Sequence, residues 1–142
     1  MSEPLITFTV PGAAQPKERP RFGSGRTYTN KKTRTYEGAV RNAALTALYF
    51  AGDAPAVLLT KGTPVKIELL FIMPRPKRTS SKHGRLPHCR RPDIDNLTKA
   101  VLDGLPKSLL HDDGQICTLH ASAFYAAADE DPHTTVKIWR IR

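Results

Sequence analysis

The stretch V-K-I-E-L-L-F-I-M, at residues 65–73, decides the fold of this chain. Apolar and polar side chains alternate over its first half, and its second half is continuously apolar. Alternation indicates a strand with one buried face, whereas a continuous apolar run is typical of a strand buried on both faces. We therefore expect residues 65–73 to form a central strand.

Two helices and three further strands are predicted around this strand. Residues 33–50 and 95–105 carry apolar side chains at the three- and four-residue spacings of amphipathic helices. Asn30 or Thr33 is expected to cap the first helix. The buried stripe of the second helix should consist of Ile94, Leu97, Val101 and Leu105. Residues 5–10, 115–126 and 134–141 alternate as strands, and the last two are expected to pair as an antiparallel hairpin.

The predicted fold class is therefore α+β, with a small mixed or antiparallel sheet of about four strands and two main helices. A chain of 142 residues is long enough for one hydrophobic core and too short for two ordinary ones. We expect a single domain over residues 1–142.

The composition points to a polyanionic partner. The net charge is +9 and the pI is near 9.9, and most of the positive charge lies in residues 1–92. Nucleic acid is favoured over a membrane, because there is neither a basic amphipathic anchor nor a run of about 18 apolar residues. The start of the chain also lacks the pattern of a signal peptide. We expect a cytoplasmic protein whose Cys89 and Cys117 remain thiols.

Residues 74–92 carry seven Lys and Arg and no acid, together with four prolines. This composition predicts a mobile basic loop that clamps DNA, although such runs also occur as purely solubilising segments. Residues 11–26 form a second basic, glycine- and proline-rich stretch. The candidate DNA contacts are Arg19, Arg21, Arg26, Arg75, Lys77, Arg78, Lys82, Arg90, Arg91, Asn96 and Lys99.

The basic loop leads into R-R-P-D-I-D-N-L-T-K at residues 90–99, where Asp93 and Asp95 are one residue apart. Neighbouring carboxylates repel each other and are commonly bridged by hard cations such as Mg²⁺ or Mn²⁺. One acid of the Asp112–Asp113 turn would supply a third carboxylate. Such a set suits metal-dependent phosphodiester hydrolysis, with Lys99 placed to contact the scissile phosphate.

These residues resemble the RusA-like Holliday-junction resolvases, in the segments R-P-D-I-D-N-L-T-K-A-V-L-D-G-L (91–105) and H-D-D-G-Q-I (111–116). Weaker similarity includes G-R-T-Y at residues 25–28. The resemblance implies that Asp93, Asp95 and Asp113 are catalytic metal ligands and that Lys99 is the catalytic lysine. Asp112 is the alternative to Asp113.

The resemblance further implies a homodimeric, Mg²⁺-dependent endonuclease, in which Mn²⁺ can substitute. Such enzymes cut four-way DNA junctions by paired symmetric nicks in recombination and repair, in bacterial or phage-infected cells.

Two other functions are considered from the sequence. In a non-catalytic basic DNA-binding protein, Asp93 and Asp95 would cap a helix, and the Asp112–Asp113 pair would form a turn. A zinc site built from His88, Cys89, Cys117 and His120 is disfavoured, because residues 117 and 120 would face opposite sides of a strand. Metal-dependent cleavage of labelled junctions separates the nuclease from the DNA-binding protein.

Overall fold

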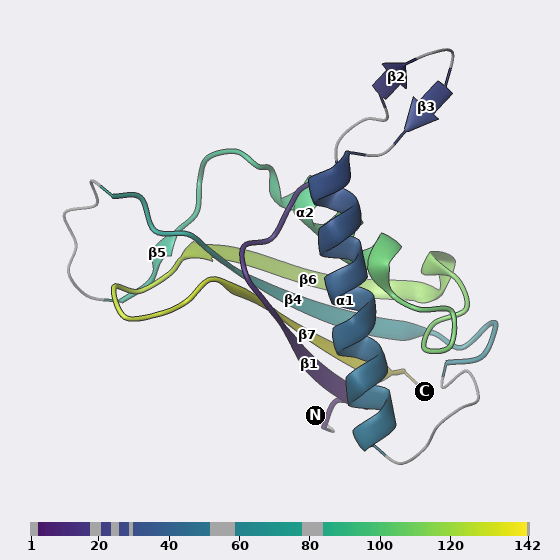
Figure 1. Cartoon of the computed structure of the whole chain (residues 1–142). Coiled ribbons are helices and arrows are strands. Elements are labelled where there is room, and N and C mark those ends of the chain that lie inside the picture. Colours follow the sequence, from purple (N-terminus) through teal and green to yellow (C-terminus); the bar gives the residue numbers. More distant parts are fainter. Residues whose placement is uncertain are drawn as a thin grey trace.

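The computed structural model describes residues 3–17, 21–23, 26–28, 30–51, 59–77 and 84–141. Its elements are β1 (Ile6–Pro11), β2 (Arg21–Gly23), β3 (Arg26–Tyr28), α1 (Lys31–Phe50), β4 (Val65–Met73), β5 (Leu86–Pro87), α2 (Ile94–Gly104), the 3-10 turn η1 (Asp113–Gln115), β6 (Ile116–Tyr125) and β7 (His133–Arg140). They form a single α+β domain with two helices and a five-stranded mixed sheet, one strand more than the expected four (Figure 1). The predicted fold class is confirmed.

β4 is the central strand of the sheet, whose order is β1-β7-β4-β6-β5. It pairs antiparallel with β7 and parallel with β6. Phe71, Ile72 and Met73, at the end of β4, are all buried. The predictions of a central strand and of burial on both faces at this end are both confirmed.

The predicted hairpin between the last two strands is wrong, because β4 lies between β6 and β7. A parallel pair such as β4 and β6 requires a crossover connection, and α2 lies in this connection. The seven residues between β6 and β7 then carry the chain past the end of β4. Alternation identified both strands correctly, but it carries no information about which strand each one pairs with.

Both helices contribute to the core on one face of the sheet, and Figure 1 shows α1 crossing this face. Val65, Ile67, Leu69 and Phe71 of β4 point into this core, as do Val136 and Ile138 of β7. Of the two predicted caps, Asn30 is the one that caps α1, since its side chain accepts a 2.8 Å hydrogen bond from the backbone N–H of Lys32.

The buried stripe of α2 differs from the prediction at its first position. Leu97 and Val101 are fully buried and Leu105 is largely buried, but Ile94 is 41% exposed. Ile94 is the first residue of α2, where the helix begins beyond the part covered by the core. Thr98, Ala100 and Gly104 are buried as well.

α1 and α2 approach each other closely at Gly104. A Cβ atom at this position would lie 2.8 Å from the carbonyl oxygen of Glu37 and 2.9 Å from Cβ of Val40. Any side chain at position 104 would push the helices apart. The glycine therefore brings the charged residues of the two helices into contact.

The described parts of the predicted basic loop are tied to the sheet. The guanidinium of Arg75 donates hydrogen bonds to the carbonyl oxygens of Gly84 and Ala126, at 3.1 and 2.9 Å. Arg85 pairs with Glu130 at 2.6 Å, and Leu86–Pro87 form β5 against β6. Residues 78–83 lie outside the described residues.

Within the described ranges, no helix has the length and apolar character needed to cross a membrane.

Candidate active site at the start of α2

The start of α2 places two carboxylates at the surface. Asp93 is the N-cap residue, and Asp95 lies in the first helical turn. The Asp93 side chain makes no capping hydrogen bond, and Asp95 is inside the helix rather than at its cap. The helix dipole favours negative charge here. The structure therefore shows neither side chain in the capping role that the DNA-binding alternative assigns to it.

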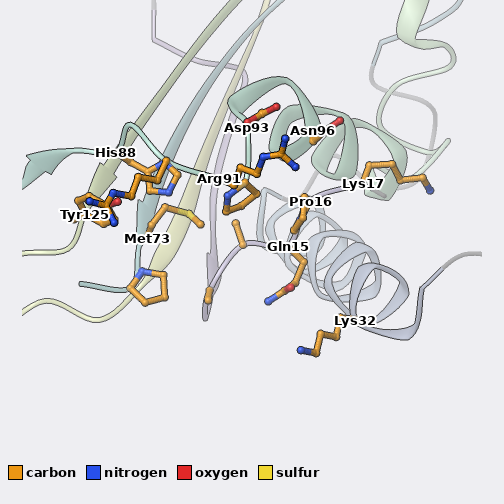
Figure 2. Close-up of a pocket in the computed structure, with 15 residues that line it drawn as sticks. Gln15, Pro16, Lys17, Lys32, Met73, His88, Arg91, Asp93, Asn96 and Tyr125 are labelled. Carbon is orange, nitrogen blue, oxygen red and sulfur yellow. The ribbon is translucent and has the colours of Figure 1, made fainter. Parts of the chain in front are cut away.

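Asp93 lines a cleft of about 940 Å³, which we call the basic cleft (Figure 2). Four cationic residues share its wall, and among the described lining residues Asp93 is the one acid. The lining consists of residues 13–17, Lys32, Met73, Pro74, His88, residues 90–93, Asn96 and Tyr125. Cationic side chains around one carboxylate make the cleft suited to phosphate groups.

The structure brings only some of the candidate DNA contacts to this cleft. Arg90, Arg91 and Asn96 line it, whereas Lys77 and Lys99 are exposed but are not part of its lining. Arg75 is engaged with the carbonyl groups described above. Arg21 lies in β2 and Arg26 in β3, while Arg19, Arg78 and Lys82 fall outside the described residues.

Lys99 takes part in a chain of ion pairs that links α2 to α1. Its amine lies 2.8 Å from Oδ1 of Asp103, one helical turn further along α2. Oδ2 of Asp103 lies 3.2 Å from the amine of Lys17, which in turn lies 3.3 Å from Glu37 of α1. We call these four residues the Lys99 network.

Backbone contacts hold Lys17 in place within this network. Its N–H donates to the carbonyl oxygen of Asn96 at 2.9 Å, and the hydroxyl of Thr33 donates to the carbonyl oxygen of Pro16 at 2.8 Å. Lys17 also lines the basic cleft. The segment before β2 thus connects the cleft to the Lys99 network.

Ion pairing changes the acid–base properties of the network. The hydrogen bond to Asp103 raises the pKa of Lys99 above its ordinary value, so the amine is charged at neutral pH. Burial acts to raise the pKa of Asp103, but the hydrogen bonds from Lys99 and Lys17 outweigh it, and this pKa lies below its ordinary value. Both charges are therefore retained at neutral pH.

Part of this network is visible in the sequence. Lys99 and Asp103 are four residues apart, which places them as neighbours on one helix face. Glu37 and Lys17 were missed as partners, because they come from segments distant in sequence. The glycine at position 104 of a predicted helix was the one available signal of close helix packing.

The Asp112–Asp113 turn is fixed by a buried glutamine. The side chain of Gln115 donates hydrogen bonds to the carbonyl oxygens of Leu59, Thr60 and Thr63, at 2.8–3.3 Å. Its Oε1 accepts a hydrogen bond from the backbone N–H of Asp112 at 2.9 Å. Gln115 is a positioning residue that the sequence analysis missed, since its partners precede it by more than 50 residues.

Asp113 lies in the electrostatic environment of the Lys99 network. Partial burial raises the pKa of Asp113, Lys99 acts to lower it, and Asp103 acts to raise it further. The third predicted carboxylate is therefore close enough to Lys99 to interact with its charge.

The described residues include no group of three or more His, Cys, Asp or Glu side chains that could hold a metal ion. Asp93, Asp95 and Asp113 thus do not form a complete three-ligand site by themselves. Their chemistry nevertheless fits Mg²⁺, which commonly takes one or two protein carboxylates and completes its shell with water and substrate phosphates. Substrate oxygens would be needed to complete a metal site here.

Surface acids beside a basic cleft are features typical of proteins that act on nucleic acids. A family model described as "Endodeoxyribonuclease RusA" matches residues 11–139. The chain belongs to the RusA endodeoxyribonuclease family. Membership confirms the resemblance seen in the sequence and implies an endodeoxyribonuclease that acts on junction DNA.

The chain is also similar to the uncharacterized protein YqaN of Bacillus subtilis (strain 168). The two sequences are 32% identical over 143 residues, and the match covers 94% of each chain.

Proposed function

We propose that this protein is a Mg²⁺-dependent Holliday-junction resolvase that cuts four-way DNA junctions by paired symmetric nicks. One observation carries the proposal: Asp93 stands at the start of α2 without a capping bond and lines a cleft whose other described charged residues are cations. A carboxylate in a phosphate-binding surface opposes DNA binding unless a cation accompanies it. Membership of the RusA family supports the same reaction class.

The charged residues of the candidate site have separate roles in this proposal. Arg90 and Arg91 bind phosphates along the cleft. Asp93, Asp95 and Asp113 would hold Mg²⁺, or Mn²⁺ in its place. The bound metal would supply an activated water and neutralise charge on the leaving oxygen.

Lys99, held by Asp103, would contact the scissile phosphate and stabilise the charge that develops on it. We assign Lys99 this role because a metal would already provide the counter-charge for Asp95.

Paired nicking favours a homodimer. The two-fold axis of a dimer would place its two active sites on two strands of a symmetric junction, so that both strands can be cut together. The proposed setting is recombination and repair in the cytoplasm of a bacterial or phage-infected cell.

The proposal is tested with a labelled synthetic four-way junction and a duplex of the same sequence, each titrated with Mg²⁺. We expect symmetric nicks in the junction only, and none in EDTA. Asp93→Asn and Asp95→Asn should abolish nicking and leave junction binding intact or tighter, because repulsion between carboxylate and phosphate is reduced. Asp129→Asn removes an exposed acid from the β6–β7 connection and serves as the control. Full activity in Asp95→Asn would contradict the metal assignment.

The same assay distinguishes between the two acids of the turn. Asp113→Asn should abolish nicking, since Asp113 lies within the electrostatic reach of Lys99. Asp112→Asn should cause a smaller loss, because Asp112 is the N-cap residue before η1 and its backbone N–H is bound by the Gln115 side chain. Equal losses would show that the choice of Asp113 over Asp112 is wrong.

A non-catalytic DNA-binding protein remains the alternative, and the same experiment separates it from the nuclease. It would bind the junction but leave it uncut in Mg²⁺ and in Mn²⁺.

A further inference from the structure

The basic cleft has one aromatic end, which the proposed cleavage reaction does not use. Tyr125 ends β6, and His88 follows β5. Their ring centroids lie 4.9 Å apart in an edge-to-face arrangement, with an interplanar angle of 65°. Met73, which is 4% exposed, and Pro74 also line the cleft. Figure 2 shows Tyr125, His88 and Met73 together on one side of the cleft.

The opposite end of the cleft is charged and polar. Asp93 and Asn96 lie there at the start of α2, with Arg91 beside them (Figure 2). A single cleft thus has an aromatic wall at one end and cations beside a carboxylate at the other. A nucleotide has the same division, because its base presents an apolar face and its phosphate carries the charge.

The aromatic wall is fixed by β-sheet pairing. Leu86 of β5 pairs with Tyr125, and the backbone N–H of His88 donates to the carbonyl oxygen of Ala123 at 3.1 Å. Tyr125 is half-buried against the core, and His88 is also partly exposed. Both rings are therefore held in position while part of each remains open to the cleft, as a stacking platform requires.

The size of the cleft agrees with such a ligand. Its volume of about 940 Å³ lies at the upper end of the range for ligand pockets, roughly 300–1,000 Å³. A base inside a duplex has both faces covered by its neighbours, so only an unstacked base can enter. In the open form of a four-way junction, stacking is interrupted where the strands cross between arms.

We propose that Tyr125 and His88 bind an unstacked base of the DNA substrate, next to the phosphate held at the Asp93 end of the cleft. This inference rests on the proposed function and extends it: the pocket would select junction DNA by admitting a nucleotide that duplex DNA does not offer. Stacking is tolerant of base identity, because every base has an aromatic face. The pocket would thus discriminate between DNA structures and not between base sequences.

The test combines a change in the protein with a change in the DNA. Tyr125→Leu keeps an apolar side chain and removes the ring, and Tyr125→Phe, which keeps the ring, is the matched control. Binding is measured in EDTA on intact junctions and on junctions with single abasic sites, placed in turn at the nucleotides flanking the cleavage position. Thermal unfolding establishes that both variants are folded.

We expect Tyr125→Leu to weaken binding of the intact junction by roughly 5- to 100-fold, and Tyr125→Phe to bind as the parent does. At one abasic position the affinity of the parent protein should fall by a similar factor, and Tyr125→Leu should not weaken binding further there. This non-additivity identifies direct contact between the ring and the base.

The inference would be overturned if the losses of binding free energy from Tyr125→Leu and from the abasic site were additive at every abasic position. Normal binding of the intact junction by Tyr125→Leu would overturn it as well. These outcomes are distinct from failure of the proposed function, in which the parent protein would leave junctions uncut in Mg²⁺. The binding measurements use no metal and therefore give a result in either case.

Discussion

Lys99 owes its position to Asp103, which holds its amine at 2.8 Å and is itself held by Lys17. An exposed ion pair of this kind contributes little to stability, because solvent screens it. Its consequence is geometric: the amine of a long, flexible side chain is fixed on one side of α2, close to Asp113. The effect of Asp103 should therefore appear in catalysis more than in folding.

Substitution of Lys99 should affect turnover. At saturating Mg²⁺ and DNA, we expect Lys99→Gln to lose about 10²–10³ in rate, the usual effect of removing one electrostatic contact to the transition state. Lys99→Arg keeps the charge but replaces a compact ammonium with a broader, planar guanidinium. Compared with Lys99→Gln, it should therefore restore DNA binding but only part of the cleavage rate. Single-turnover cleavage across a Mg²⁺ titration is the measurement. If excess metal returns Lys99→Gln to the parental rate, the lysine acts through metal affinity and our assignment is wrong.

Asp103 is expected to act through Lys99. Asp103→Asn removes the charge that fixes the amine, so the rate should fall by less than in Lys99→Gln, with the melting temperature almost unchanged. Because both changes disable the same group, the double variant should be no slower than Lys99→Gln alone. If the rate losses of the two single variants multiply in the double variant, Asp103 acts independently of Lys99.

Packing between elements decides whether this network can form. The approach of α1 and α2 at Gly104 brings Glu37 of one helix near Asp103 of the other, with Lys17 between them. Since even a Cβ atom at position 104 would meet the carbonyl oxygen of Glu37 and the side chain of Val40, any change in the separation of the helices would also move their carboxylates.

Gly104→Ala tests this contact. Its Cβ would lie 2.8 Å from the carbonyl oxygen of Glu37, so the helices must move apart, at a cost of about 1–3 kcal/mol in the free energy of unfolding. We expect a lower melting temperature and a slower reaction in the folded protein. Gly38→Ala is the control, because none of the described neighbours lies within 4 Å of its added Cβ. In this helical position alanine should be neutral or stabilising. Equal effects of the two substitutions would exclude a special role for the contact at Gly104.

Cationic residues lie on both sides of the sheet, and only one side carries the basic cleft. The cations of the basic cleft lie beside the helices, on the covered side of the sheet. Lys137 lies on the other side, because Val136 and Ile138, which flank it in β7, point into the core under the helices. The basic cleft and Lys137 therefore lie on opposite sides of the sheet.

The salt dependence of junction binding tests which side of the sheet contacts DNA. Replacing Arg90 and Arg91 by Gln should weaken junction binding and reduce the slope of log K against log salt by about 0.9 for each phosphate that the variant no longer binds. Lys137→Gln removes a charge from the opposite side and should leave the slope unchanged. Equal slopes for the parent and the arginine variant would show that the basic cleft is not the DNA-binding surface.

The sequence by itself determined most of the elements of this protein and its family. β4, both helices and the strands β1, β6 and β7 follow from periodicities within single segments, and N-cap preference narrowed the cap of α1 to Asn30 or Thr33. The acids of residues 90–99 and of the Asp112–Asp113 turn, with the cations before them, indicated the family. These features are local, so neighbouring residues are sufficient to specify them.

Only the tertiary structure decided the order of the strands, the partners of Lys99 and the shape of the basic cleft. The short strand β5 was not predicted, and it fixes His88 beside Tyr125. Likewise, Lys17 and Glu37 reach Asp103 only because α1 and α2 pack at Gly104. Such contacts join residues far apart in the chain, and they form when apolar surfaces from all segments are buried together, which no single periodicity specifies.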